Sequence, residues 1–191
     1  MAVLPIRITG DPVLHAVAEA VTEFDDDLRQ LVADMVETMD LAPGVGLAGP
    51  QVGVAKRLFV FSWTDDDDVS WRGAAINPDL WITPPRPETV EELDEDDESE
   101  GCLSIPGERF PLRRSSSALL RASDEHGEPF EIEAHGWLAR IFQHEYDHLD
   151  GLLYADRLSH PYLKQSVKAV RKQSWGVPGQ SWLPGRDHPE G

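Results

Sequence analysis

The segment Trp137–Leu149 predicts a helix with two histidines on one face, and this feature constrains the chain most. Apolar residues recur in it at the 3.6-residue spacing of a helix that is buried along one side. His144 and His148 are four residues apart, so both imidazoles can reach one metal ion. Glu145 lies one position away, where a carboxylate can act on water at the metal. The pattern is typical of metallohydrolases, and the alternative is a buried helix with unrelated histidines.

Two histidines do not complete a catalytic metal site, which normally has three protein ligands and one open position. A third histidine ten residues after the first is excluded, because Tyr154 stands there. Asp150 and Asp156 are open alternatives, and the single cysteine, Cys102, is the better candidate. The other interpretation of Cys102 is a small buried apolar residue. One cysteine cannot form an internal disulfide, which is consistent with a reducing compartment.

A glycine-rich segment, Gly44–Gly53, is the third distinctive feature of the chain. Its small residues allow the backbone to approach a ligand closely, and Gln51 offers an amide donor for a developing oxyanion. It does not fit a phosphate-binding loop, because no lysine or Ser/Thr ends it. Taken alone, this segment indicates a structural turn more often than a site.

Together the three segments GVGLAGPQ (44–51), EGCLS (100–104) and QHEYDH (143–148) resemble, in order and separation, the signature motifs of the peptide deformylases. The resemblance extends from about Pro5 to Leu158. The closing segment, residues 175–185, is similar to the tail of actinobacterial members. One difference is Gly49, where the family usually has a second alanine.

The resemblance implies an activity and a role for each motif. Deformylases remove the formyl group from the N-terminal formyl-methionine of newly made bacterial polypeptides, which would be the substrates. Glu145 would be the general acid and base, while the Gln51 amide and the Leu103 backbone N–H would stabilise the oxyanion. The residues that would bind the metal are Cys102, His144 and His148. Ligand type alone favours Zn2+, whereas the resemblance implies Fe2+, with Ni2+, Co2+ or Zn2+ as substitutes.

Specificity for methionine is expected to come from an apolar slot beside the metal. Trp137 and Ile141 precede the first histidine by two turns and one turn, and Val45 lies in the glycine-rich segment. All three are candidate pocket walls, and plain core residues are the equal alternative. The backbone of Val45 and Gly46 can pair with a substrate main chain as an added strand. Arg109 is expected to orient the site or substrate, or to pair with an acid.

Periodicity predicts an α+β fold, with antiparallel or mixed sheets packed around a central metal-binding helix and with an N-terminal and a C-terminal helix. The first helix is expected to start near Asp25. The predicted strands are residues 57–62, 74–77, 118–122 and 129–133. The predicted organisation is one catalytic domain, residues 1–160, and a C-terminal helix with a Trp/Pro/Gly-rich tail, residues 161–191, packed on it or extending from it.

The net charge of −18 argues against DNA or general nucleic-acid binding. No stretch approaches the roughly 20 apolar residues of a membrane span, and the N-terminus lacks the pattern of a signal peptide, so a cytoplasmic protein is expected. The acidic runs at residues 65–68 and 91–98 are interpreted as solvated loops, the second within an acidic loop at 88–100.

A basic face is predicted on the C-terminal helix, at Lys164, Lys168, Arg171 and Lys172. A solvated face is the favoured interpretation, and docking to the ribosome near emerging chains is the alternative. Two other function classes compete with the deformylase. A general endopeptidase does not predict a cysteine in the EGCLS context, and a structural metal module needs a fourth protein ligand.

Overall fold

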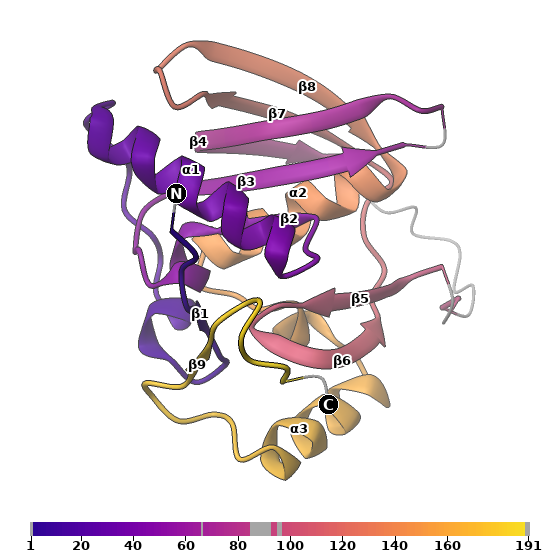
Figure 1. The fold of residues 1–191 in the computed structure, drawn as a ribbon. Coiled ribbons are helices and arrows are strands. Elements are labelled where there is room, and N and C mark those ends of the chain that lie inside the picture. Colours follow the sequence, from indigo (N-terminus) through magenta and orange to yellow (C-terminus); the bar gives the residue numbers. More distant parts are fainter. Residues whose placement is uncertain (1, 66, 85–92, 95–96, 190–191) are drawn as a thin grey trace.

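A five-stranded antiparallel sheet forms one half of the molecule (Figure 1). The computed structural model describes residues 2–65, 67–84, 93–94 and 97–189. The strands of this sheet, in spatial order, are β2 (Gly46–Ala48), β3 (Leu58–Thr64), β4 (Ser70–Ile82), β7 (Ser117–Ser123) and β8 (Pro129–His135). The four predicted strands are confirmed. β4 is longer than predicted, because a bulge after Ile76 interrupts the alternation that marks a strand.

Helices α1 (Asp26–Leu41) and α2 (Gly136–Leu149) cover opposite faces of this sheet. Successive strand residues point to opposite faces, so Val60 of β3 packs with α1 while Phe61 packs with α2. The α1 helix begins as predicted, since the carboxylate of Asp25 accepts the backbone N–H of Leu28 at 2.9 Å. The α+β fold expected from the sequence is therefore confirmed.

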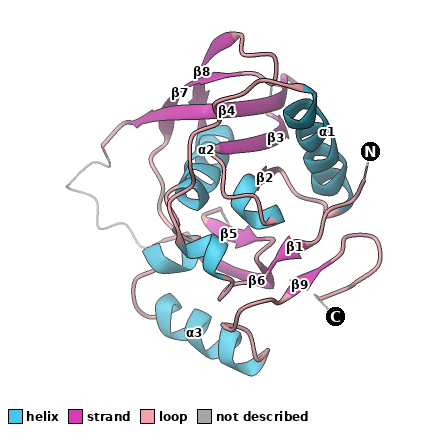
Figure 2. Cartoon of the chain, turned by 90° about the vertical axis from the view of Figure 1, so that its left-hand side faces the viewer, coloured by secondary structure: helices cyan, strands magenta, loops and turns pink. Residues whose placement is uncertain are grey.

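The other half of the molecule holds a small hairpin, a C-terminal helix and a short pair of strands from near the two chain ends. Figure 2 shows α2 between the large sheet and this hairpin, so the helix that carries His144 and His148 is buried on two sides. The elements are β1 (Ile6–Arg7), β5 (Ser99–Cys102), β6 (Ile105–Pro111), α3 (Tyr162–Lys172) and β9 (Ser181–Trp182). Strand β1 pairs with β9, and β5 pairs with β6.

The acidic run at 91–98, interpreted as a solvated loop, ends in the exposed Asp97 and the half-buried Glu98, and the acidic residue that follows it, Glu100, is buried. Residues 85–92 and 95–96 lie outside the described part of the chain. Glu98 pairs with Arg113, and Glu100 is 3% exposed within β5. Arginines that are distant in the sequence supply the counter-charge that allows these carboxylates to be buried.

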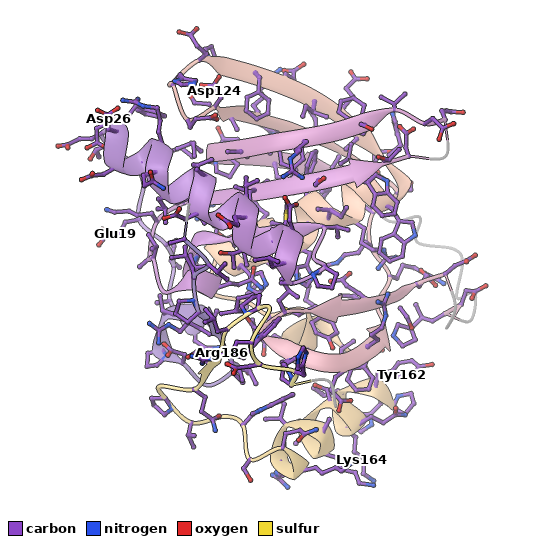
Figure 3. The ribbon with its side chains drawn as sticks, in the orientation of Figure 1. Glu19, Asp26, Asp124, Tyr162, Lys164 and Arg186 are labelled. Carbon is purple, nitrogen blue, oxygen red and sulfur yellow. The ribbon has the colours of Figure 1, made fainter. Side chains whose placement is uncertain are left out.

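The C-terminal tail returns to the start of the chain. Trp182 of β9 is 7% exposed and packs in the same core as Ile6. On α3, the exposed Lys164 lies at the opposite end of the molecule from Asp26 and Asp124 (Figure 3). No helix in the described ranges is long and apolar enough to cross a membrane. The predicted division of the chain at residue 160 stays a prediction.

Candidate metal centre

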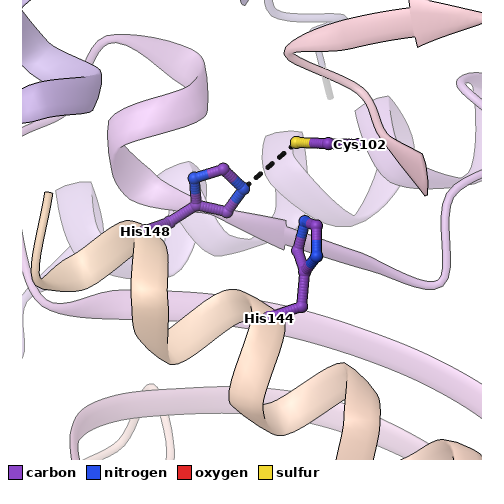
Figure 4. A group of neighbouring side chains, drawn as sticks. All are labelled: Cys102, His144 and His148. Carbon is purple, nitrogen blue, oxygen red and sulfur yellow. Dashed lines mark hydrogen bonds between the residues drawn. The ribbon is translucent and has the colours of Figure 1, made fainter. Parts of the chain in front are cut away.

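Two histidines of α2 and the cysteine at the end of β5 meet in the interior (Figure 4). One ligand atom each from Cys102, His144 and His148 lie within 4.8 Å of one another, and no other such group of three occurs among the described residues. The Sγ of Cys102 is 3.3 Å from Nε2 of His148. The alternative ligands lie elsewhere, because Asp150 pairs with Arg57 and Asp156 accepts a backbone N–H.

The chemistry of these three residues fits a divalent transition metal with one open position. Two nitrogens and one sulfur form a donor set that suits Fe2+ or Zn2+. Burial lowers the pKa of His148 well below its ordinary value, which keeps this imidazole neutral as a ligand must be. Burial acts likewise on His144, but the charges and hydrogen bonds of Cys102 and Glu100 outweigh it and raise the pKa of that ring. A cation that binds His144 must therefore displace a proton.

A buried ion-pair cluster contacts one of the two histidines, His144. Nδ1 of His144 lies 2.6 Å from a carboxylate oxygen of Glu100, which leaves the other ring nitrogen for a metal. Burial opposes ionisation of Glu100, yet the His144 and Arg114 contacts hold its pKa well below the ordinary range. The whole cluster consists of Glu100, Arg114, Arg140, Asp147 and Arg157. Sequence reasoning missed it, although Glu100 and Asp147 stand inside the two metal motifs.

The carboxylate of Glu145 is buried, and the charge of the adjacent His144 only partly offsets the effect of this burial on its pKa. Its Oε2 has no hydrogen-bond partner among the described residues, and burial raises its pKa to about 7. The Glu145 carboxylate can lie against β2 because residue 46 is a glycine. A Cβ at residue 46 would overlap the carboxylate. A carboxyl group with such a pKa can both accept and release a proton near neutral pH.

The side chain of Gln51 faces the cysteine from the short 3₁₀ helix Gly49–Val52. Its Oε1 accepts the backbone N–H of Ala48 at 2.8 Å, which fixes the orientation of the amide. Nε2 then points to Cys102 Sγ at 3.6 Å and to Ser104 Oγ at 3.4 Å. The glycine-rich segment thus forms part of a site, and the structure places an amide donor beside the cysteine.

A cavity of about 540 Å³ opens beside Cys102, His144 and Glu145. The sequence-predicted residues on its wall are Gln51, Leu103, Val45, Gly46, Arg109, Trp137 and Ile141. Trp137 stacks on Trp63 of β3, with ring centroids 6.0 Å apart, and sequence reasoning missed Trp63. Arg109 donates to the backbone carbonyl of Ser99 at 3.0 Å, and it forms no salt bridge with a described acidic residue.

Tyr154 occupies the position where some metalloproteases carry a third histidine. Its ring stacks on His144 with centroids 6.0 Å apart, and its hydroxyl donates to the carbonyl of Glu108 at 3.1 Å. Tyr154 therefore packs against His144 and restricts the position of its ring. The third member of the group, beside the two histidines, is Cys102 of β5.

Comparisons with known proteins agree with this geometry. A family model described as polypeptide deformylase matches residues 3–164. The chain is 50% identical to a peptide deformylase of Mycolicibacterium paratuberculosis over 192 residues, which cover 97% of this chain and 96% of that relative. It is 48% identical to a peptide deformylase of Tropheryma whipplei over 190 residues, which cover 95% of this chain and 82% of that relative.

Solved structures give the same result. The peptide deformylase of Synechococcus elongatus, determined in complex with actinonin, has a TM-score of 0.74 and 36% identity over 92% of each chain. The enzyme of Thermus thermophilus has a TM-score of 0.72 and 38% identity over 89% of this chain and 94% of that chain. With its cluster of one cysteine and two histidines, this chain belongs to the peptide deformylase family of metal-dependent hydrolases.

Proposed function

We propose that this protein hydrolyses the N-formyl group of N-terminal formyl-methionine on newly made polypeptides and releases formate. One observation carries the proposal beyond family membership. The glycine-rich segment, the EGCLS segment and the metal-binding helix, which are far apart in the sequence, meet around a single cavity. A metal-ligand cluster, an amide donor and a buried carboxylate with a raised pKa there supply the parts that amide hydrolysis needs.

The proposed metal ligands are Cys102, His144 and His148, and we propose Fe2+ as the physiological ion, with Ni2+, Co2+ or Zn2+ as substitutes. A bound divalent ion would supply Lewis acidity and make water a stronger nucleophile near neutral pH. The Glu100 carboxylate, 2.6 Å from Nδ1 of His144, would orient that ligand. A thiolate ligand makes the ferrous form sensitive to oxidation.

Glu145 is the proposed general acid and base. Its carboxylate accepts a proton from the attacking water, because burial gives it a pKa of about 7 and no hydrogen bond from a described residue occupies Oε2. It then passes this proton to the departing amine. The Gln51 amide and the Leu103 backbone N–H, both on the cavity wall, donate to the oxyanion as it forms.

The substrate main chain is proposed to lie along β2. This strand is at the edge of the sheet, so the backbone at Val45 and Gly46 can pair with an added strand. Trp137 and Ile141 form the proposed walls for the methionine side chain, since both line the cavity. Arg109 is the proposed cation that orients the substrate at the rim.

The first test is formate release from a formyl-Met-Ala-Ser peptide. The protein is purified without oxygen and loaded with Fe2+ or Ni2+. Turnover is expected in the wild type and in Glu128→Gln, which changes an exposed glutamate of the hairpin turn. In Glu145→Gln, turnover is expected to fall by about 100-fold or more while the metal stays bound. Cleavage of internal bonds in a denatured protein, without formate release, would favour an endopeptidase instead.

We propose a cytoplasmic location, because newly made polypeptides are the substrates and a reducing compartment preserves the single thiol of Cys102. For α3 we propose a solvated basic face, with ribosome docking as the alternative. The exposed cations Lys164, Lys168 and Arg171 can be reversed together without touching the buried Trp182. Docking predicts weaker co-pelleting of this triple Glu variant with ribosomes at low salt, and a solvated face predicts no change.

A further inference from the structure

The C-terminal tail touches the turn that carries the metal-binding cysteine. The indole Nε1–H of Trp182 donates to the backbone carbonyl of Leu103 at 2.9 Å, across 79 positions of the sequence. On the other side, the backbone N–H of Thr9 donates to the carbonyl of Ser104 at 2.9 Å. Both ends of the chain therefore hold the two residues that follow Cys102.

One peptide unit links the indole to the sulfur. The carbonyl of Leu103 and the N–H of Ser104 belong to the same planar peptide group, which turns as a rigid body. That N–H donates to Cys102 Sγ at 3.4 Å. The indole thus fixes the direction of an N–H···S hydrogen bond, and it polarises the same peptide group in the favourable sense. Hydrogen bonds to a metal-binding sulfur tune both its donor strength and its orientation.

The indole itself is held firmly. Trp182 is paired with Ile6 across β1 and β9 and is 7% exposed. The pairing continues outward, because the N–H of Ile8 donates to Gln180 at 3.0 Å and the N–H of Gly176 donates to Thr9 at 3.0 Å. The hydrogen bond to Leu103 is therefore built into the core rather than formed by a free surface side chain.

We propose that Trp182 is a positioning residue of the metal centre, which acts on Cys102 through the Leu103–Ser104 peptide. The tail would then determine how the thiolate meets the metal, although none of its residues lines the cavity described above. This inference rests on the proposed metal site of Cys102, His144 and His148. It predicts that loss of the indole N–H weakens metal retention without changing the affinity for substrate.

The test uses the full-length protein loaded with Co2+, whose sulfur-to-cobalt absorption band reports on the thiolate. Trp182 is replaced by 3-benzothienylalanine, which keeps the shape of the side chain and has sulfur in place of N–H, and separately by phenylalanine. The matched control is Trp175→Phe, because Trp175 is in the same tail and packs on the core without a hydrogen bond from its indole to Leu103. Cobalt loss to a chelator, the absorption band and the KM for formyl-Met-Ala-Ser are measured.

Both Trp182 replacements are expected to lose cobalt about tenfold faster and to shift the band, with KM unchanged. Trp175→Phe is expected to match the wild type. A benzothienylalanine protein with wild-type cobalt loss and absorption would overturn the inference, even if Trp182→Phe were impaired, because packing alone would then explain the effect. A folded wild type that binds no cobalt through sulfur would instead overturn the metal site and the inference together.

Discussion

Two buried polar groups lie beside the candidate metal ligands His144 and His148, and they are built in opposite ways. In the ion-pair cluster every carboxylate meets a cation, and the pKa of Glu100 is held low despite its burial. Glu145 is equally buried, but it has an oxygen without a described partner and a pKa of about 7. Unpaired buried charge is costly, so a fold retains it where reactivity requires it. The ion-pair cluster gives rigidity, and the Glu145 carboxyl group stays available for proton transfer.

Removing one cation from the cluster should give the largest loss of stability. Arg114 is 5% exposed and bonds to both Glu100 and Asp147 at 2.6 Å. In Arg114→Met both buried carboxylates lose a partner, and the free energy of unfolding should fall by about 3–5 kcal/mol. Urea denaturation at pH 7 measures this loss.

The neighbouring Arg113→Met is the matched control, because Arg113 is 35% exposed in its pair with Glu98. A partly exposed pair contributes about 1 kcal/mol or less. If Arg114→Met and Arg113→Met unfold at the same urea concentration, the buried cluster contributes no more to the free energy of unfolding than the partly exposed pair does.

At Glu145, removing the charge should increase the free energy of unfolding rather than lower it. The pKa of Glu145 rises from 4.5 to about 7 on folding, so the folded state binds this proton more tightly. That stabilisation is complete below pH 4.5 and is lost as the pH rises to about 7. Glutamine does not titrate. The metal-free Glu145→Gln variant should therefore gain stability relative to the wild type across this window, by up to about 3 kcal/mol above pH 7.

Denaturation curves of the metal-free proteins between pH 5 and 8 measure that difference. The exposed Glu128→Gln variant should show no such trend. A stability difference for Glu145→Gln that is independent of pH would show that burial does not raise the pKa of this carboxyl group.

A milder change, a substitution at Gly46, displaces the Glu145 side chain without removing it. In Gly46→Ala the new Cβ overlaps the Glu145 carboxylate, and the end of this side chain must shift. The kcat for formyl-Met-Ala-Ser should fall about 10- to 100-fold, since a displaced general base loses alignment with its water. The free energy of unfolding should change little. Gly73→Ala, where a Cβ makes only ordinary contact with Phe61, should keep full activity. Unchanged kcat in Gly46→Ala would argue against Glu145 as the base.

The sequence predicts well what is set by local pattern. The spacing of His144 and His148, the cap at Asp25 and the apolar run of β3 each follow from a few consecutive residues. The long-range contacts of the site residues do not follow from the local sequence. Glu100 reaches His144 across 44 positions and Trp182 reaches Leu103 across 79, and no periodicity encodes such contacts. Chain topology brings them together, so the candidate ligands could be named from the sequence and their supporting contacts could not.

The smallest effect is expected at Gly49, in the glycine-rich segment. A Cβ at residue 49 would lie 2.9 Å from the backbone oxygens of both Val54 and Lys56. These atoms belong to the turn that follows, in which the N–H of Val54 donates to Gly49 at 2.9 Å, so they cannot move independently. Gly49→Ala should lower the free energy of unfolding by about 1–2 kcal/mol through overpacking. Because Gln51 lies two residues later, kcat should also fall slightly, whereas KM should stay unchanged. A variant as stable as the wild type would show that the turn can widen. Steric crowding would then not explain why residue 49 is a glycine.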